Sequence, residues 1–455
     1  MPLDPHPPAR IPCPAPAADA DPLVETRSAC AARLDVPPST PSPVISAHRA
    51  SQPRLATEHG GKRGLRVLMI LESGFPVRGG GGAESQVRTL ALELIRRGHR
   101  VTVLTPRVGN APQARVERCW RIPVCRLAYP RVRGLGRLVL WLRLLAFLRG
   151  HGRHYDAWHV HIAHYLGAIA CRVGSALHKP TIVKISGWWE LERGLLAPRN
   201  GALARAGQRW LKRASALQAI SQRIAGELAR LGFPRERILA LPNAVDTARF
   251  AARPQRAGAA PLSVLFVGRL VREKGLPSLL NAWALAFPER GRARLRLVGG
   301  GALETQLREQ AGQLGIAADV EFLGHRDDVE ALIADSELGL LTSISEGLSN
   351  TLLEFMAGCL PVIASRVSGS EDVVVGGRNG WLFAPGDVVA LSDALRAAAA
   401  LRGAGLDALG RQARADIEAY ASLDVVVGRL LALYRGADPA SLRFAPPAAA
   451  QLQGG

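Results

Sequence analysis

Two loops in the second half of the chain carry the residue types that bind phosphorylated ligands. In residues 267–275 (VGRLVREKG), Gly268 ends an apolar run and lets the backbone pass close to a ligand, while Arg269 and Lys274 supply two cations. Two cations on one strand-end loop can hold a diphosphate without a metal ion. The alternative is a solvated basic loop, and both the strand-end glycine and a second anion site nearby argue against it.

The second anion site is predicted in residues 345–354 (SEGLSNTLLE), where a turn leads into a helix. Free amides at the start of a helix bind anions, because they point at the ligand and lie at the positive end of the helix dipole. We expect four residues of this turn and first helical positions to form the pocket: Gly347, Ser349, Asn350 and Thr351.

Two carboxylates flank this helix start. Glu346 precedes the helix, and Glu354 lies roughly two turns inside it, so they should contact different parts of one ligand. Carboxylates accept hydrogen bonds from hydroxyls, and a sugar nucleotide has hydroxyls on both its ribose and its sugar. Either residue alone would be read as an ordinary surface or capping residue, whereas the pair with the loop is more specific.

A glycine run and a group of histidines lie in the first half of the chain. Gly81 and Gly82 end the run at 79–82, which follows a buried strand and is expected to lie in a ligand cleft. The spacing of the glycines does not match a dinucleotide-binding motif. His159 and His161 alternate along a strand and therefore share one face. A histidine at a strand end is more often structural than catalytic, but we expect His161 to line the cleft.

Apolar runs of strand length alternate with helical patterns throughout the ordered chain. This alternation predicts an α/β protein with doubly wound sheets, and it restarts after a proline- and alanine-rich break at 251–261. Ligands of such sheets bind at the carboxyl ends of the strands, where both loops lie. The expected strands include 65–71, 101–104, 159–161, 181–185, 262–267, 295–298, 320–323, 338–341 and 361–364.

The length of 455 residues favours two domains. We expect a disordered Pro/Ala-rich tail at 1–61, which holds 13 of the 31 prolines, and a first Rossmann-like domain at 62–250. A second Rossmann-like domain is expected at 262–410, followed by a helix at 411–437 that crosses back to the first domain. Residues 438–455 are expected to be a second disordered tail.

The chain is basic, with 58 lysines and arginines against 38 acidic residues and a net charge of +20. Such a charge suits nucleic acid, anionic lipid or phosphorylated ligands, but the basic residues form no long tract, which argues against a nucleic-acid-binding arm. No apolar stretch reaches the ~18–20 residues that span a bilayer, and no secretory signal is recognisable, so we expect a cytoplasmic protein. The cysteines show no metal-ligand spacing and are expected to be reduced: Cys13, Cys30, Cys119, Cys125, Cys171 and Cys359.

The motifs together resemble the GT-B-fold glycosyltransferases of family four, in which two Rossmann-like domains face a central cleft. The resemblance is dense over 240–390 and looser over 65–200. It is carried by LPNAVDTARF (241–250), VGRLVREKG (267–275), LVGGG (297–301), FLGHRDDV (322–329) and SEGLSNTLLEFMAGCLPVIAS (345–365).

The resemblance implies a retaining transfer of sugar from a nucleotide-diphosphate sugar such as a UDP- or GDP-sugar, with no metal cofactor. Arg269 and Lys274 would bind the donor phosphates, and Glu354 the ribose hydroxyls. Glu346 would bind the transferred sugar. The only Asp-x-Asp, at 19–21, lies in the predicted tail and agrees with the absence of a metal site.

One segment departs from the family pattern. Many relatives carry a histidine beside the reacting sugar in a Thr-x-His-Gly-like context, whereas residues 184–190 read KISGWWE, with Ser186 at the corresponding place. A role carried by that histidine therefore does not transfer to this chain. Trp188 and Trp189 are candidates for stacking on a sugar, with burial in the core as the commoner alternative.

Residues 131–149 (RVRGLGRLVLWLRLLAFLR) are rich in leucine and arginine. As a helix they would either lie on an anionic membrane surface, at the inner face of the plasma membrane, or pack on the first domain's sheet. The membrane interpretation favours a lipid-linked acceptor, and a glycan acceptor remains open. Synthesis of cell-surface polysaccharide or glycolipid is the expected role.

Two other functions remain open at this stage. A sugar-nucleotide epimerase on the same architecture would alter its donor without an acceptor. A nucleic-acid-binding protein would show salt-sensitive binding that survives charge reversal at Arg269 and Lys274, although no RNA- or DNA-reading motif supports it. The sugar, the nucleotide base, the acceptor and the linkage do not follow from these motifs.

Overall fold

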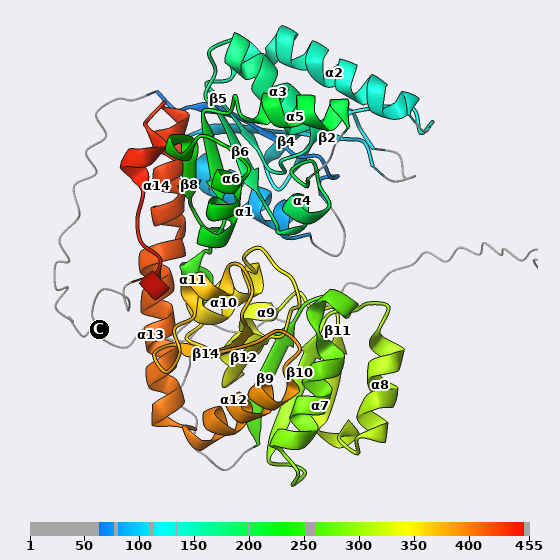
Figure 1. Cartoon of the computed structure of the whole chain (residues 1–455), viewed down its shortest axis with the longest axis vertical. Coiled ribbons are helices and arrows are strands. Elements are labelled where there is room, and N and C mark those ends of the chain that lie inside the picture. Colours follow the sequence, from blue (N-terminus) through cyan, green and yellow to red (C-terminus); the bar gives the residue numbers. More distant parts are fainter. Residues whose placement is uncertain are drawn as a thin grey trace, which may run out of the picture. The chain divides into compact units, whose positions relative to one another are not determined.

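The computed structural model describes residues 63–76, 81–108, 113–132, 134–198, 201–250 and 261–449. These residues form an eight-stranded sheet, then a six-stranded sheet, each with its own helices (Figure 1). The predicted tail at 1–61, Gly79 and Gly80, and all but the last residue of the predicted break at 251–261 lie outside the described residues.

The first sheet has the strand order β3-β4-β2-β1-β5-β6-β7-β8. All neighbours are parallel except β3 and β4, which form an antiparallel hairpin at one edge. Its strands are β1 (Arg66–Ile70), β2 (Arg100–Pro106), β3 (Val116–Cys119), β4 (Ile122–Leu127), β5 (Ala157–Val160), β6 (Thr181–Ile185), β7 (Ala216–Ala219) and β8 (Ile238–Ala240).

The second sheet is parallel throughout, with the order β11-β10-β9-β12-β13-β14. The order runs outward from β9 in both directions, which is the doubly wound pattern. Its strands are β9 (Leu262–Val267), β10 (Ala293–Val298), β11 (Val320–Gly324), β12 (Leu338–Leu341), β13 (Val362–Ser365) and β14 (Gly380–Phe383).

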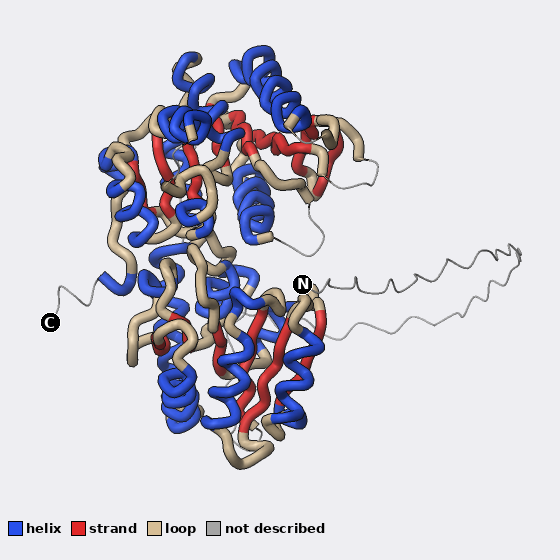
Figure 2. Tube along the Cα trace, turned by 45° about the vertical axis from the view of Figure 1, so that its right-hand side comes forward, coloured by secondary structure: helices blue, strands red, loops and turns tan. Residues whose placement is uncertain are grey.

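Helices cover both faces of each sheet, as the tube in Figure 2 shows. The predicted fold class, two Rossmann-like α/β sheets, is therefore confirmed. The helices that matter below are α1 (Gly82–Arg96), α2 (Leu135–His151), α3 (Tyr165–Ala176), α4 (Trp189–Glu192), α6 (Gln222–Arg230), α7 (Leu276–Ala286), α8 (Glu304–Gln313), α10 (Asn350–Ala357), α11 (Ser370–Val373), α13 (Ala404–Ala421) and α14 (Leu423–Tyr434).

The apolar run that predicted β1 is buried on both of its faces. Val67 and Met69 belong to the core shared with α1 and α14, whereas Leu68 and Ile70 belong to the core on the opposite face. A strand with side chains in two cores must be apolar at every position, which is why its sequence does not alternate.

The hairpin of β3 and β4 was not predicted, because its sequence lacks the usual turn signal. A two-residue hairpin turn needs left-handed backbone and favours Asn-Gly or Asp-Gly. Here Trp120 and Arg121 take that conformation, with φ of 48° and 71°.

The predicted single helix at 411–437 is two helices, because Ser422 is extended between α13 and α14. α13 contacts α10 of the second domain, and α14 contacts α1 and β6 of the first. Ser422 also forms a β-bridge with Val245, so the chain returns to the first domain at this residue.

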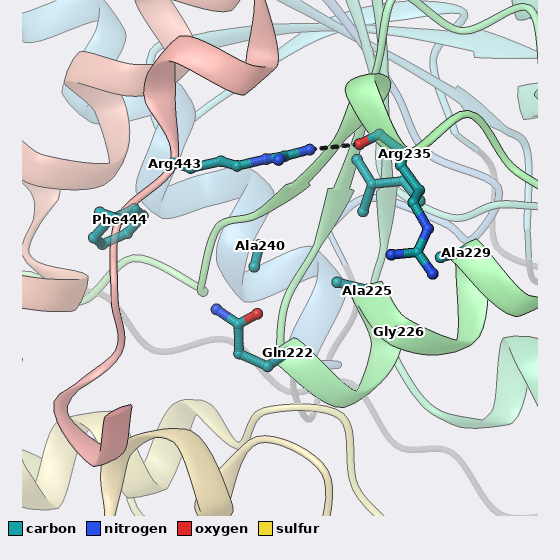
Figure 3. Close-up of a pocket in the computed structure, with 9 residues that line it drawn as sticks. Gln222, Ala225, Gly226, Ala229, Arg235, Ala240, Arg443 and Phe444 are labelled. Carbon is teal, nitrogen blue, oxygen red and sulfur yellow. Dashed lines mark hydrogen bonds between the residues drawn. The ribbon is translucent and has the colours of Figure 1, made fainter. Parts of the chain in front are cut away.

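The prediction of a disordered tail from residue 438 is wrong for residues 438–449. Asp438 caps a short helix at Pro439–Leu442, and Arg429 lies over the Phe444 ring, 3.8 Å from its centroid. The Arg443 guanidinium donates to the Arg235 carbonyl at 2.7 Å (Figure 3). These contacts hold residues 438–449 in place, although the apolar content of this segment by itself predicts no structure.

This C-terminal segment borders a pocket of about 410 Å³ against α6 and β8. Small residues of α6, Ala225, Gly226 and Ala229, form part of its wall (Figure 3). None of the predicted site residues lines this pocket, so it is separate from the candidate site.

Candidate functional site

Close backbone contacts shape the loop after β9. A Cβ on Gly299, after β10, would lie 2.0 Å from the Gly268 carbonyl oxygen, and Gly299 has a left-handed φ of 124°. The Gly268 amide donates to the Val298 carbonyl at 2.9 Å. Only glycine fits at position 299, and the contact turns the loop that carries Arg269. The Arg269 side chain is exposed to solvent.

The two loops predicted from the sequence are in direct contact. The Lys274 ammonium forms an ion pair with the Glu346 carboxylate, which also accepts a hydrogen bond from the Ser343 hydroxyl at 3.1 Å. The Thr342 hydroxyl donates to the Lys274 carbonyl at 2.7 Å. Position 275, the N-cap of α7, admits only glycine, since a Cβ there would lie 2.1 Å from the Thr342 carbonyl oxygen. The cationic loop and the acidic loop therefore form one site.

The predicted helix start is present as α10. Its N-cap residue, Ser349, is extended, and its side chain makes no capping hydrogen bond. Thr351 lies in the first turn, whose amides have no acceptor within the helix. Residues 349–351 therefore do form a helix N-terminus, and its use as an anion pocket stays a prediction.

Gly347 allows the loop before α10 to touch the first domain. A Cβ at this position would lie 2.7 Å from Cδ1 of Ile220 and 3.0 Å from Cα of Gly187. Since any side chain would separate these segments, glycine is required here for close approach rather than for an unusual backbone angle.

The Asn350 side chain makes contacts other than those predicted for it as part of an anion pocket. Its amide group donates to the Gly82 carbonyl at 3.1 Å, and its oxygen accepts from Gln86 at 3.1 Å and from Asn243 at 2.9 Å. Gln86 also pairs with both backbone groups of Ala244. Asn350 therefore joins the start of α10 to the start of α1, and only its backbone amide remains for an anion.

The same bonds place the end of the glycine run beside the candidate site. Gly81 is the N-cap residue of α1, and Gly82 is its first residue. The hydrogen bond from Asn350 places Gly82 next to the start of α10, and the cleft position of the two glycines stays a prediction.

Glu354 lies apart from the Lys274–Glu346 pair, among different charges. Burial raises the pKa of Glu354 to about 7, while Arg249 lowers it and Glu330 raises it. Arg249 and Glu330 are themselves an ion pair. The two acids thus have different charged neighbours, and their contact with different parts of one ligand stays a prediction.

The prediction that His161 lines the cleft is wrong, because the side chain is fully buried. Neither ring nitrogen has a hydrogen-bond partner among the described residues, and the ring lies 4.1 Å from that of His159. The two histidines do share a face, but α14 covers it: His159 Nδ1 is 2.7 Å from the Tyr434 hydroxyl. Burial lowers the pKa of both, that of His159 to about 3.

The loop after β6 depends on a residue that the sequence analysis missed. The buried Glu190 carboxylate accepts hydrogen bonds from the amides of Ala163 at 2.6 Å, Ser186 at 2.6 Å and Gly187 at 3.1 Å. Burial raises the pKa of Glu190 to about 8, and the three amides act in the opposite direction. Glu190 thereby holds the loop after β5 and the loop after β6 together.

Ser186, at the place of the family histidine, has a structural role in this loop. Its hydroxyl donates to the His161 carbonyl at 2.8 Å. Trp188 is half-buried, with Arg223 4.8 Å from its ring centroid, and Trp189 is 42% exposed. An acid four residues after the serine, directly after a buried strand, is the signal that identifies Glu190 in the sequence.

Comparison with known proteins gives matches to family models and to solved structures of the same fold. Residues 80–249 match a family model described as Glycosyltransferase Family 4, and residues 261–400 match one described as Glycosyl transferases group 1. Anabaena HepE, solved in complex with UDP, has a TM-score of 0.65 at 20% identity and covers 81% of this chain and 98% of its own. Sucrose-phosphate synthase from Thermosynechococcus elongatus has a TM-score of 0.66 at 22% identity, covering 82% and 98%.

Curated relatives are also similar in sequence. The putative colanic acid biosynthesis glycosyltransferase WcaL of Escherichia coli is 33% identical over 220 residues, 46% of this chain and 54% of the relative. The phosphatidyl-myo-inositol mannosyltransferase of Mycobacterium leprae is 29% identical over 359 residues, 73% and 86%. The chain spans about half the length of the first curated relatives that it matches.

The two Rossmann-like sheets and the joined loops define a protein of the GT-B fold. One glycosyltransferase family model matches each domain, and the fold is the one that GT-B glycosyltransferases share. Neither the epimerase nor the nucleic-acid-binding alternative is favoured by these matches.

Among the described residues, no helix is long and apolar enough to cross a membrane.

Proposed function

We propose that the protein is a retaining glycosyltransferase that moves a sugar from a nucleotide-diphosphate sugar to a glycan or lipid-linked acceptor. The observation that carries the proposal is the Lys274–Glu346 ion pair, which joins the cationic loop to the loop preceding α10. A phosphate-binding cation, a hydroxyl-binding acid and a helix N-terminus then belong to a single site.

The chemistry follows from the charge that develops when the sugar–phosphate bond breaks. The leaving diphosphate gains negative charge, and preorganised positive groups lower that barrier. Arg269, Lys274 and the first amides of α10 would supply them without a metal ion. Since an ammonium has three N–H donors, Lys274 can bind a phosphate oxygen while it keeps its bond to Glu346.

The two acids would divide the donor's hydroxyls between them. Glu346, beside Lys274, would accept hydrogen bonds from the transferred sugar, and Glu354 would accept them from the ribose. An ionised carboxylate is a better acceptor than a protonated one, so the raised pKa of Glu354 makes donor binding pH-dependent in this proposal.

The transfer step would occur on one face of the sugar. The acceptor hydroxyl oxygen forms a bond to the anomeric carbon on the side from which the diphosphate leaves, and its proton passes to a diphosphate oxygen. No carboxylate is assigned as a nucleophile. Detection of a covalent glycosyl-enzyme would contradict this step.

We also propose peripheral binding to the inner face of the plasma membrane through α2. Its buried residues recur every four positions, Gly136, Leu140, Leu144 and Leu148, and pack toward α3. Its other face exposes leucines and arginines, and residues 131–151 contain no acidic residue. The exposed set is Leu135, Arg137, Leu138, Leu142, Arg143 and Arg149.

This exposed face suits an anionic lipid surface, because leucines enter the interface while arginines meet the head groups. Sedimentation with vesicles that contain phosphatidylglycerol tests it, with vesicles of phosphatidylcholine alone as the comparison. Leu138→Asp and Leu142→Asp should abolish binding to the anionic vesicles. Equal binding by the variant and the original protein would contradict the membrane proposal.

Donor binding is tested by calorimetry with UDP-glucose, UDP-N-acetylglucosamine and GDP-mannose. We expect one of them to bind, and Lys274→Ala and Glu354→Ala to weaken that binding at least tenfold. Arg272→Ala, an exposed cation of the same loop, is the matched control. If neither variant weakens binding of the sugar nucleotide with the highest affinity, the site assignment is wrong.

Two further measurements test the finer parts of the proposal. The anomeric configuration of the product, determined by NMR, should equal that of the donor. Transfer should persist in the presence of EDTA. An inverted product would exclude the retaining step, and loss of activity that Mg²⁺ or Mn²⁺ restores would exclude metal independence.

A further inference from the structure

The loop after β6 carries two adjacent tryptophans in different surroundings. Trp188 is half-buried, packs against the apolar core, and has the Arg223 guanidinium 4.8 Å from its ring centroid. Trp189, the first residue of α4, is 42% exposed. Of these two rings, it is therefore that of Trp189 that presents a free surface to a ligand.

A second exposed tryptophan in the same domain has its ring surface occupied. Trp120, in the turn between β3 and β4, is 46% exposed, but the Arg88 guanidinium lies over its ring, 4.3 Å from the centroid. The Phe75 ring also meets it edge-on, with 5.9 Å between the centroids. Within the part of the chain that the structure describes, no cation or aromatic ring is placed on Trp189 in this way. Its exposed indole is thus the better candidate for a binding surface.

The backbone that carries Trp189 is held firmly in place. The Glu190 carboxylate accepts hydrogen bonds from the Ser186 and Gly187 amides at 2.6 and 3.1 Å, and the Glu190 amide donates to the Gly187 carbonyl at 3.2 Å. A Cβ on Gly187 would lie 2.8 Å from Cδ1 and 3.0 Å from Nε1 of Trp189, so the edge of the indole rests directly on this glycine. A ring fixed in this way loses little freedom when a ligand binds, which favours affinity.

The same glycine connects the ring to the candidate donor site. A Cβ on Gly347 would lie 3.0 Å from Cα of Gly187, and Gly347 directly follows Glu346, which pairs with Lys274. Gly187 thus touches both the Trp189 ring and the loop that precedes α10. An acceptor must bind near this place, because its hydroxyl oxygen has to reach the anomeric carbon of a sugar held by Glu346.

An indole ring is suited to one face of a pyranose. The C–H groups on that face are apolar and carry a small positive charge, so they pack against the negative face of an aromatic ring. A pyranose is also rigid enough to cover the ring while its hydroxyls stay at the rim, in contact with polar groups or water. An acyclic polyol or a bare phosphate offers no such face.

We propose that the Trp189 indole is a stacking platform for the ring of the acceptor sugar. The inference rests on the proposed function, since it needs an acceptor, and it narrows that acceptor to one whose reacting end is a pyranose. It assigns the acceptor site to the loop after β6, with Glu190 as the positioning residue that holds the ring in place.

Three substitutions separate stacking from apolar bulk. Trp189→Leu keeps an apolar side chain without an aromatic face, and Trp189→Phe keeps a smaller aromatic face. Trp120→Leu removes a similarly exposed indole elsewhere in the same domain and is the matched control. We expect Trp189→Leu to raise the acceptor KM roughly tenfold, the loss of about one stacking contact, and Trp189→Phe to raise it only about threefold. The control should keep the original KM.

The acceptor probes are n-octyl glucoside, n-octyl galactoside and n-octyl mannoside, used with the sugar nucleotide of highest affinity. Acceptor KM, donor KM and kcat are measured for each variant, and thermal melting confirms that each variant is folded. Acrylamide quenching of tryptophan fluorescence gives a second readout without turnover. With the donor's nucleoside diphosphate bound, the best glycoside should protect fluorescence in the original protein and in Trp120→Leu, but not in Trp189→Leu.

The proposal requires that donor KM changes less than twofold while acceptor KM rises. It is overturned if Trp189→Leu leaves acceptor KM unchanged, if Trp189→Phe is impaired as much as Trp189→Leu, or if donor KM rises equally. It is also overturned if none of the three glycosides serves as acceptor. A protein that binds no sugar nucleotide would instead refute the proposed function.

Discussion

The two domains build their strand-end loops in different ways. In the second domain the charged residues come from two contiguous segments, 267–275 and 345–354, each placed by one strand. In the first domain Glu72 and Glu190 come from separate loops, and each reaches the segment after β5 only through tertiary contacts. Glu72 contacts His164 and Leu166, and Glu190 accepts from the Ala163 amide. A site made of local segments is therefore visible in a sequence, whereas a site assembled from distant loops is not.

The charged residues of the two domains also differ in how far they are buried. In the second domain Lys274 and Glu346 remain partly exposed as an ion pair, available to a ligand. In the first domain Lys184 and Glu190 are buried, and burial lowers the pKa of Lys184 to about 7 and raises that of Glu190 to about 8. We therefore expect direct chemical effects from substitutions in the second domain and positioning effects from those in the first.

The largest effect is expected for Lys274→Ala. Removing one preorganised positive charge that stabilises the leaving group lowers the rate on the order of 10³-fold. Transfer kinetics should show this loss in kcat/KM, with Arg272→Ala near the original value. Equal losses of kcat/KM in Lys274→Ala and Arg272→Ala would mean that the loop contributes only general positive charge. The second domain would then show no direct chemical effect to set against the positioning effects of the first.

Gly347→Ala is expected to reduce kcat/KM by about 100-fold. The new Cβ would lie within 3.0 Å of Ile220 and Gly187, and a misplacement of about 1 Å costs on this order. Gly312→Ala, at an exposed helical site with open space around it, is the control. Normal kinetics in Gly347→Ala would show that the contact between the domains is not needed for catalysis.

Glu190→Gln tests whether the first domain acts through positioning. The amide NH₂ would face one of three backbone donors, so one loop must move, and we expect kcat to fall 10- to 100-fold with little change in donor KM. Leaving a buried donor unpaired should also lower the free energy of unfolding by about 1–3 kcal/mol. A change in donor KM alone would place Glu190 in the donor site instead.

Glu354→Gln is expected to weaken donor binding about tenfold at pH 8 and to remove its pH dependence. Because the pKa is raised to about 7, the carboxylate ionises between pH 6 and 8, and donor affinity in the original protein should rise over that interval. Calorimetry at pH 6, 7 and 8 measures this.

The same substitution should affect stability in the opposite direction. A carboxyl whose pKa is higher in the folded than in the unfolded state destabilises the fold as pH rises above the unfolded value. Glu354→Gln should therefore raise the melting temperature at pH 8 and change it little at pH 4. A lower melting temperature at pH 8 would contradict the assigned pKa direction.

The smallest catalytic effect is expected for His161→Leu, which should change kcat/KM less than twofold. Its effect should appear in stability instead. Burial depresses the pKa of His159 and His161, so each contributes stability at neutral pH that is lost as pH falls below about 6.5. Urea unfolding at pH 7 and pH 5 should show a weaker pH dependence in the variant; a large loss of activity would return His161 to the site.

The fold and the second-domain loops were predictable because their signals are local. Apolar runs such as 262–267 and the helix start at Ser349 depend on neighbours in the chain, and the structure has both. The use of Asn350 was not predictable, since its partners Gln86 and Asn243 lie far away in the sequence. The turn at Trp120 and Arg121 was missed because non-glycine residues take left-handed angles there.

By itself, the order of apolar and polar residues determined the α/β architecture, the loops that carry Lys274 and Glu346, and the helix that begins at Asn350. Tertiary structure alone decided that Lys274 meets Glu346, that His159 meets Tyr434 of α14, and that Glu72 meets His164. The physical reason is range: periodicity and helix capping act over a few residues, whereas burial and hydrogen bonding depend on whichever segment the folded chain brings alongside.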